Sequence, residues 1–91
     1  MIDKPQAAVA TTGSGWVTTA LEPFTHYFQF SLDIDAYVVL DSVATDPAQN
    51  GDPLTAGVNR VIECWGCKYV HHKRTASSNA TLSYKCRIGS R

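Results

Sequence analysis

The feature that most constrains the fold is a strict alternation of apolar and polar side chains near the end of the chain. The run is Ala80-Thr81-Leu82-Ser83-Tyr84-Lys85-Cys86-Arg87-Ile88. Successive side chains of an extended strand point to opposite faces, so the run predicts one buried face and one face toward solvent or a partner. We therefore expect a strand over residues 80–88, with Cys86 in the core behaving as a small hydrophobe.

The rest of the chain also favours strands. No window combines apolar residues at helical spacing with caps at both ends. Short runs rich in Val, Thr, Tyr, Phe and Ile alternate with clusters of Gly, Pro, Asn, Asp and Ser, which is typical of all-β domains. Further strands are expected at residues 16–21, 25–32, 36–43, 58–65 and 67–74. About six strands predict a small antiparallel β-sandwich or barrel.

Two of these strands have patterns that predict burial. In the strand 25–32, the side chains of Phe24, His26, Phe28, Phe30 and Leu32 share one face. On that face His26 fits a hydrogen-bonded histidine of the core or its rim better than it fits a ligand. In the strand 36–43, the apolar centre 37–40 indicates burial on both faces.

Two segments fall outside the expected strands. Residues 1–13 contain Pro5 and small side chains without apolar anchors, so we expect a flexible N-terminal arm, disordered alone or ordered by a partner. Residues 14–91 then form one domain. The loop 44–57 holds two Asp-Pro pairs and Asn50-Gly51, all turn formers. It is either a crossover between two sheets or a loop that carries contacts.

Composition indicates an ordered, soluble chain. Hydrophobic residues make up 44% and charged residues 18% of the 91 residues, which fits a single globular domain. No apolar run approaches the ~20 residues of a membrane helix, and the N-terminus lacks the features of a secretory signal. We therefore expect a protein made in the cytoplasm, with no membrane partner.

The net charge of zero conceals an asymmetry along the chain. Residues 1–57 carry seven acidic residues and one basic residue, and residues 58–91 carry seven basic residues and one acidic residue. Either the two parts fold together and mix their charges on one surface, or the acidic side of one subunit meets the basic side of another. The domain as a whole is not basic, so we expect no nucleic-acid partner.

The segment Cys64-Trp65-Gly66-Cys67 admits several interpretations. With His71 or His72 and Cys86, the two cysteines have the composition of a zinc site, but a zinc ribbon would need a second C-x-x-C pair. No helix follows the pair to lower a thiol pKa, as a redox site would require. In a single extended strand, residues three apart lie ~10 Å from each other, too far for a disulfide. We therefore expect no metal and reduced thiols, with Gly66 in a type II turn that closes a hairpin or marks a bulge.

Other catalytic patterns are missing from the sequence. Gly13-Ser14-Gly15 is a flexible linker rather than the Gly-x-Ser-x-Gly nucleophile turn of a hydrolase. Asp33 and Asp35 fit a tight connection better than a calcium loop. We therefore expect no enzymatic activity and no cofactor.

The order of features resembles the small β-sandwich structural proteins of tailed bacteriophage virions. The likeness covers roughly residues 24–88 and rests on Ser31 and Asp33 at the end of one strand, Tyr69-Val70-His71 in another, and the final run 80–86. In this family a basic residue is usual after Tyr-Val, and the Cys-Trp-Gly-Cys segment is unusual. The resemblance implies a virion component, of the head decoration or cement type or a head-fibre or tail subunit.

The implied partners are other virion proteins, namely capsid or tail subunits and further copies of the same chain. We expect contacts through residues 1–15 and 44–57 and through the bases of the last strand. The candidate contact residues are Lys4, Pro5, Trp16, Asp46, Asp52, Lys85 and Arg87. The bases of the last strand also fit a plain solvated face that protects a sheet edge. A competing hypothesis is a standalone module that binds carbohydrate or peptide through Trp16, Tyr27 or Trp65.

Overall fold

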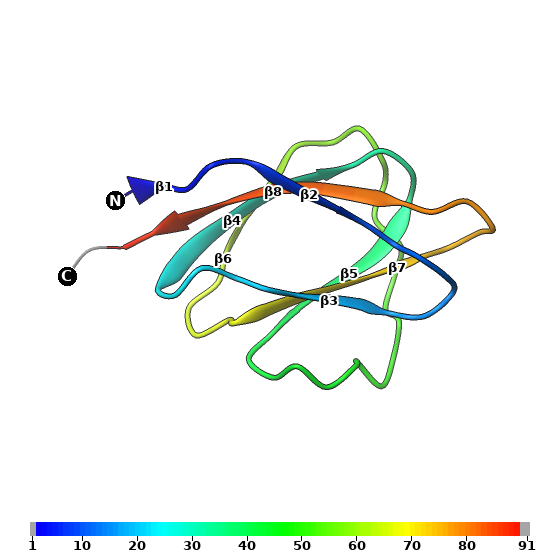
Figure 1. The fold of residues 1–91 in the computed structure, drawn as a ribbon, viewed down its shortest axis with the longest axis horizontal. Helices are drawn as coiled ribbons and strands as arrows, with labels where there is room; N and C mark the ends of the chain where they lie inside the picture. The colour runs from blue at the N-terminus through cyan, green and yellow to red at the C-terminus, as the bar shows by residue number, and fades with distance from the viewer. Residues whose placement is uncertain (1, 90–91) are drawn as a thin grey trace.

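A computed structural model describes residues 2–89 of the chain as an all-β domain of two packed antiparallel sheets (Figure 1). The larger sheet has the order β1-β8-β4-β6, with β2 also on β8, and the smaller has the order β3-β7-β5. The strands are β1 (Ile2–Asp3), β2 (Ala7–Ala10), β3 (Val17–Ala20), β4 (Thr25–Leu32), β5 (Ala36–Asp41), β6 (Arg60–Glu63), β7 (Tyr69–Arg74) and β8 (Thr81–Ile88). The prediction of a small antiparallel β-sandwich is confirmed.

From β2 onward, successive strands alternate between the two sheets. The chain passes from β2 in the larger sheet to β3 in the smaller one, and then alternates between the sheets to β8. The long segment between β5 and β6 is therefore a crossover between sheets, as one of the two interpretations predicted. It makes one bridge of its own, between Leu54 and Ala36.

The core lies between the sheets and comes from the alternating positions of β4 and β8. Phe28, Phe30 and Leu82 are almost completely buried, and the rings of Phe28 and Phe30 lie 5.4 Å apart. Cys86 is buried on the same face of β8, as the alternation predicted. Burial of apolar surface at this scale is the main stabilising contribution in so small a domain.

Two predictions about burial are wrong. Phe24 does not share the inner face of β4: it lies in the turn before the strand and its side chain is 78% exposed. The centre of β5, residues 37–40, is only half-buried, because β5 is an edge strand whose outer face lacks a covering sheet.

The segment expected to be a free arm pairs with its own domain. β1 pairs with β8 at Ile2–Ile88 and Asp3–Arg87, and β2 pairs with β8 from Ala7–Tyr84 to Ala10–Thr81. These pairs use main-chain groups, which every residue except proline supplies. The absence of apolar anchors, on which the expectation of an arm rested, therefore does not prevent residues 2–10 from forming a sheet edge.

Candidate functional site

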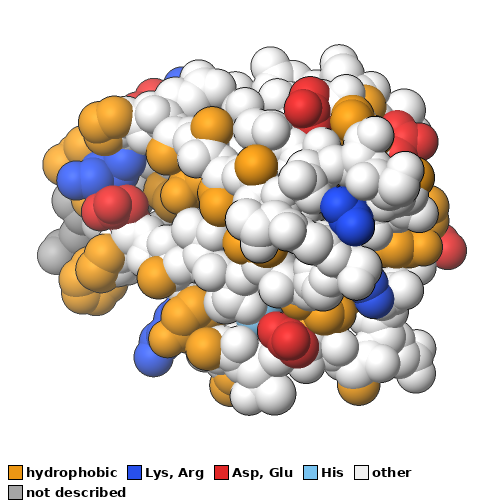
Figure 2. All heavy atoms as spheres, turned by 45° about the vertical axis from the view of Figure 1, so that its right-hand side comes forward, with side chains coloured by type: hydrophobic (Ala, Val, Ile, Leu, Met, Phe, Trp, Pro, Cys, Tyr) orange, Lys and Arg blue, Asp and Glu red, His pale blue; other side chains and the backbone are white. Residues whose placement is uncertain are grey.

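A cleft of about 530 Å³ opens at one end of the sandwich, between the β3–β4 turn and the β6–β7 turn. The lining is mainly apolar and comes from Ala20, Leu21, Glu22, Pro23, Phe24, Thr25, His26, Trp65, Gly66, Cys67, Lys68 and Tyr69. Figure 2 shows hydrophobic side chains on the left of the face it draws, the side on which Figure 1 places these turns, and others over the middle and right of the face. An apolar concave site with a few polar groups is the usual form of a binding site.

The β6–β7 turn, which contains the Cys-Trp-Gly-Cys segment, is not a hairpin. β6 pairs with β4 in the larger sheet, and β7 pairs with β3 and β5 in the smaller sheet, so the segment carries the chain across the sandwich. Gly66 has a φ of 81°, the left-handed conformation that glycine adopts without strain. The predicted turn at Gly66 is confirmed, but its predicted role in a hairpin or bulge is wrong.

The β3–β4 turn holds Phe24 in an unusual backbone conformation. Its φ is 64°, a value that costs a residue with a side chain about 1–2 kcal/mol. The turn is fixed on both sides: the Thr25 hydroxyl donates to the carbonyl oxygen of Glu22, and the Gly89 N–H donates to the carbonyl oxygen of Phe24 at 3.1 Å. The result is an aromatic ring that projects into solvent beside the cleft.

Trp65 is the second exposed aromatic residue of the cleft, with 60% of its surface accessible. Its indole N–H donates to the carboxylate of Glu63, and its ring meets the His26 ring edge-on with the centroids 3.9 Å apart. Because the one polar group of the side chain is already bonded, what Trp65 offers a partner is apolar ring surface.

His26 lines the inner part of the cleft where the pairing of β4 with β8 shifts register, between Thr25 and Tyr27. Only 9% of the residue is exposed, and its Nδ1 atom has no hydrogen-bond partner among the described residues. The chain passes close behind the ring: a Cβ atom on Gly89 would lie 2.5 Å from Nε2 of His26. His26 is therefore a buried histidine at the rim of the core, as predicted. The sequence also predicted a hydrogen-bonded side chain, and Nδ1 departs from that prediction.

Of the three cysteines, Cys67 lines the cleft and Cys64 and Cys86 do not, and all three are free thiols. Cys64 and Cys86 are buried and Cys67 is half-buried. Burial, with smaller contributions from the neighbouring Cys67 and Cys86 thiols, raises the pKa of Cys64 to about 12. A thiol with so high a pKa is protonated at neutral pH and is a poor nucleophile.

His71 does not lie with the cysteines, so the residues weighed as zinc ligands in the sequence do not come together. It is buried on the outer side of the smaller sheet, where its Nε2 donates to the carbonyl oxygen of Val43 at 3.1 Å. Its Nδ1 lies 2.8 Å from the hydroxyl of Thr18, which donates to it. Across residues 2–89 no cluster of three or more His, Cys, Asp or Glu side chains is placed to hold a metal ion.

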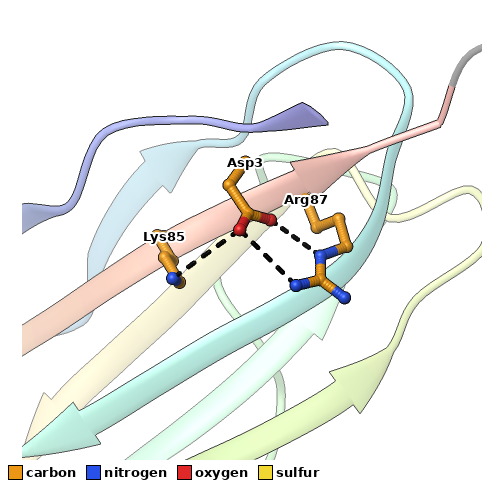
Figure 3. A network of polar contacts seen from close by, with 3 residues as sticks. All are labelled: Asp3, Lys85 and Arg87. Carbon is orange, nitrogen blue, oxygen red and sulfur yellow. Dashed lines mark hydrogen bonds and ion pairs between the residues drawn. The ribbon is translucent and has the colours of Figure 1, made fainter. Parts of the chain in front are cut away.

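The candidate contact residues are spread over several surfaces and do not form one site. Arg87 donates to Asp3 at 2.7 Å, and Lys85 lies 3.9 Å from the same carboxylate, so both bases are used within the chain (Figure 3). Lys4 lies 3.7 Å from Glu22 at the edge of the cleft. Arg87 holds the pKa of Asp3 below its ordinary value, chiefly through the hydrogen bond.

The remaining candidates do not line the cleft. Trp16 packs edge-on against His71, and Lys73 lies 5.6 Å above the Trp16 ring. Pro5, Asp46 and Asp52 are exposed. The two ion pairs of Asp3 join the acidic and basic parts of the chain, so the charge asymmetry is mixed at that place on the surface.

Sequence reasoning found Trp65 and Cys67 but missed Phe24 and the cleft itself. The available signal was Glu22-Pro23, which stops the preceding strand and makes a turn. That signal does not give the sign of φ at the next residue, which decides whether the aromatic ring faces the core or solvent.

Comparisons with known proteins give no relative for this chain. No protein-family model, no curated protein and no solved structure matches it. Residues 2–89 contain no helix of the length and apolarity needed to cross a membrane.

Proposed function

We propose that the protein is a non-enzymatic structural subunit that assembles with further copies of itself through the end cleft. The observation that carries the proposal is the exposed ring of Phe24, which stands beside an apolar hollow on the same end of the molecule. In a two-fold contact the same patch serves both subunits, and residue i contacts j while j contacts i. Phe24 of each copy then enters the cleft of the other.

The charges at the cleft suit the same arrangement. Glu22 and Lys68 both line it and are both exposed. A two-fold axis through the cleft brings Glu22 of one copy toward Lys68 of the other, and such complementarity steers and registers association. This pairing supports a second copy as the occupant, because one molecule supplies both signs of charge, the projecting ring and the hollow.

The polar groups near the cleft support binding rather than catalysis. The indole N–H of Trp65 and the hydroxyl of Thr25 are bonded to Glu63 and to the Glu22 carbonyl oxygen, and the Cys64 thiol is protonated. The Nδ1 atom of His26, which also lines the cleft, has no hydrogen-bond partner among the described residues. The remaining surface is apolar, and burying it at about 25 cal/mol per Å² would stabilise a contact.

The proposed setting is a phage virion, with the head decoration or cement type favoured. This part of the proposal rests on the resemblance of residues 24–88, and the capsid or tail subunits are the implied partners. Assembly with further copies is tested first, because it needs only the protein itself.

Sedimentation equilibrium over a wide range of concentration tests self-assembly. We expect the natural chain to associate, and Phe24→Asn and Trp65→Ala to shift the equilibrium strongly toward the monomer. Ile34→Ser is the matched control: Ile34 is an exposed apolar residue in the β4–β5 turn, at the other end of the sandwich, and its loss leaves association unchanged.

Two results would overturn the proposal. One is a natural chain that stays monomeric at every concentration, and the other is association that neither cleft variant weakens. A monomer that binds a glycan or peptide array, and loses that binding with Trp65→Ala, would support the standalone binding module instead.

A further inference from the structure

The N-terminal strands are held to β8 mostly by main-chain contacts. Besides the paired strands themselves, the Lys4 N–H donates to the Cys86 carbonyl oxygen at 2.9 Å, and the Thr11 N–H donates to the Ala80 carbonyl oxygen at 3.0 Å. The main side-chain contribution near the start is the ion pair of Asp3 with Arg87 (Figure 3). A second copy of β8 offers every one of these partners unchanged.

The side chains of residues 2–10 bury little surface in their own domain. Ala7, Ala8 and Ala10 of β2 are exposed, and Val9 is half-buried against the core. A hollow of about 240 Å³ is lined by residues 4–7 together with Ala20, Glu22, Tyr84 and Cys86. Separating this segment from its own core therefore exposes little apolar area.

The connection from β2 to β3 has the properties of a hinge. Thr12, Ser14 and Gly15 are exposed, and the space where a Cβ atom would stand at Gly13 or Gly15 is empty to 4 Å. Glycine adopts many backbone conformations, so the connection can straighten without breaking packed contacts. The N-terminal segment 2–10 also begins beside the cleft, since Lys4 lies 3.7 Å from Glu22, which lines the cleft.

We propose that copies of this protein exchange their N-terminal strands, so that residues 2–10 of one copy lie against β8 of a second. The proposal rests on the proposed self-assembly and specifies how the subunits are joined. Exchange reforms the same hydrogen bonds and the same ion pair between two chains instead of within one. A contact at the cleft brings the second β8 close and raises its effective concentration for the strand.

Cysteine pairing across β2 and β8 distinguishes exchange from pairing within one chain. Ala8 and Ser83 are register partners and neither is buried. Directly opposite residues of an antiparallel pair have Cα atoms about 4.5–5.5 Å apart, within the range of a disulfide. One chain carries Ala8→Cys and a second, differently tagged, carries Ser83→Cys. The two are unfolded, refolded together and oxidised, and disulfide-linked peptides are mapped by mass spectrometry.

The expected result is a covalent heterodimer linked through positions 8 and 83. Pairing Ala8→Cys with Ser77→Cys is the control, because Ser77 lies in the exposed β7–β8 turn away from β2. This control also measures how much disulfide the three native thiols form under the same conditions. The double variant Ala8→Cys/Ser83→Cys in one chain reports on the alternative, since pairing within one chain gives a cross-linked monomer.

The outcomes separate this proposal from the proposed function. A chain that associates but forms only the cross-link within one chain overturns strand exchange and leaves self-assembly standing. A chain that is monomeric throughout overturns both. Deleting Ser14 and Gly15 shortens the hinge, so exchange predicts a higher share of oligomer, and an unchanged share would contradict it.

Discussion

The two ends of the sandwich are built in opposite ways. At the end that holds the β7–β8 turn, polar groups of Thr11, Asn79, Asp33 and Arg74 bond to one another and to the main chain. At the cleft end, Phe24 and Trp65 project apolar rings into solvent. Hydrogen bonds among polar groups hold the turns of an end in one arrangement, whereas exposed apolar surface gains stability when a partner covers it. The first end thus closes the domain, and the second carries the exposed apolar surface on which the proposed self-assembly rests.

The closed end depends most on Thr11, which is 1% exposed. Its hydroxyl donates to Asn79 Oδ1 at 3.2 Å and accepts from the Ala80 N–H at 2.9 Å. Thr11→Ala leaves a buried N–H without a partner, so we expect a loss of about 1–3 kcal/mol in the free energy of unfolding. Urea denaturation measures it. Thr12→Ala, at an exposed neighbour, is the control, and an equal loss in both variants would contradict this account.

The chain is tightly packed at Gly89, which lies against the His26 ring at the cleft end. Gly89→Ala places a methyl group 2.5 Å from the His26 ring, and forcing atoms into such a site costs about 1–3 kcal/mol. We expect lower stability in urea and, because the ring shifts, a change in Trp65 fluorescence. Gly13→Ala serves as the control, since its Cβ meets nothing within 4 Å. A neutral Gly89→Ala would show that this end is looser than the other.

Burial makes the interior next to the closed end sensitive to pH. His72 is fully buried, its Nε2 donates to the Ala80 carbonyl oxygen at 3.3 Å, and burial lowers its pKa below the ordinary 6.5. At pH values between the pKa of His72 in the folded chain and the ordinary pKa of 6.5, this histidine binds a proton in the unfolded chain and not in the folded chain. Stability therefore falls as pH drops below about 6.5, by at most about 1.4 kcal/mol per pH unit.

Urea denaturation from pH 7 downward measures this slope. Because His72→Gln removes the titrating group, the variant should have a smaller slope over the same window, even if its stability at pH 7 is lower. An equal slope in both proteins would assign the pH dependence to other groups.

A substitution of Phe24 should weaken self-association without lowering the stability of the monomer. Phe24→Asn removes an apolar ring that is exposed and replaces it with a residue that tolerates positive φ. We expect the free energy of unfolding of the monomer to stay the same or rise by up to about 1 kcal/mol, while self-association weakens. Urea denaturation in dilute solution and sedimentation provide the two readouts. Loss of stability comparable with that of Thr11→Ala would mean that Phe24 stabilises the monomer, against the contrast drawn between the two ends.

Much of the fold could be predicted because the determining signal is local. The alternation from Ala80 to Ile88 and the run from Thr25 to Leu32 predicted β8 and β4 closely, since the side-chain period of a strand is visible in the sequence. β1 and β2 were missed because main-chain pairing with β8 holds them and leaves no apolar pattern. Trp65 and Gly66 were found through turn chemistry, but the cleft needs the β3–β4 turn beside them, and no local pattern reports that neighbour.

The sequence by itself determined that the chain is all-β, where most strands run, that Cys86 faces the core and that Gly66 makes a turn. Only the tertiary structure decided which strands pair, that the segment 64–67 connects a strand of one sheet to a strand of the other, and that Phe24 faces solvent. The physical reason is range. Side-chain alternation and turn propensity act over a few residues, whereas strands from β2 onward alternate between sheets, so every pairing partner is supplied by a distant part of the chain.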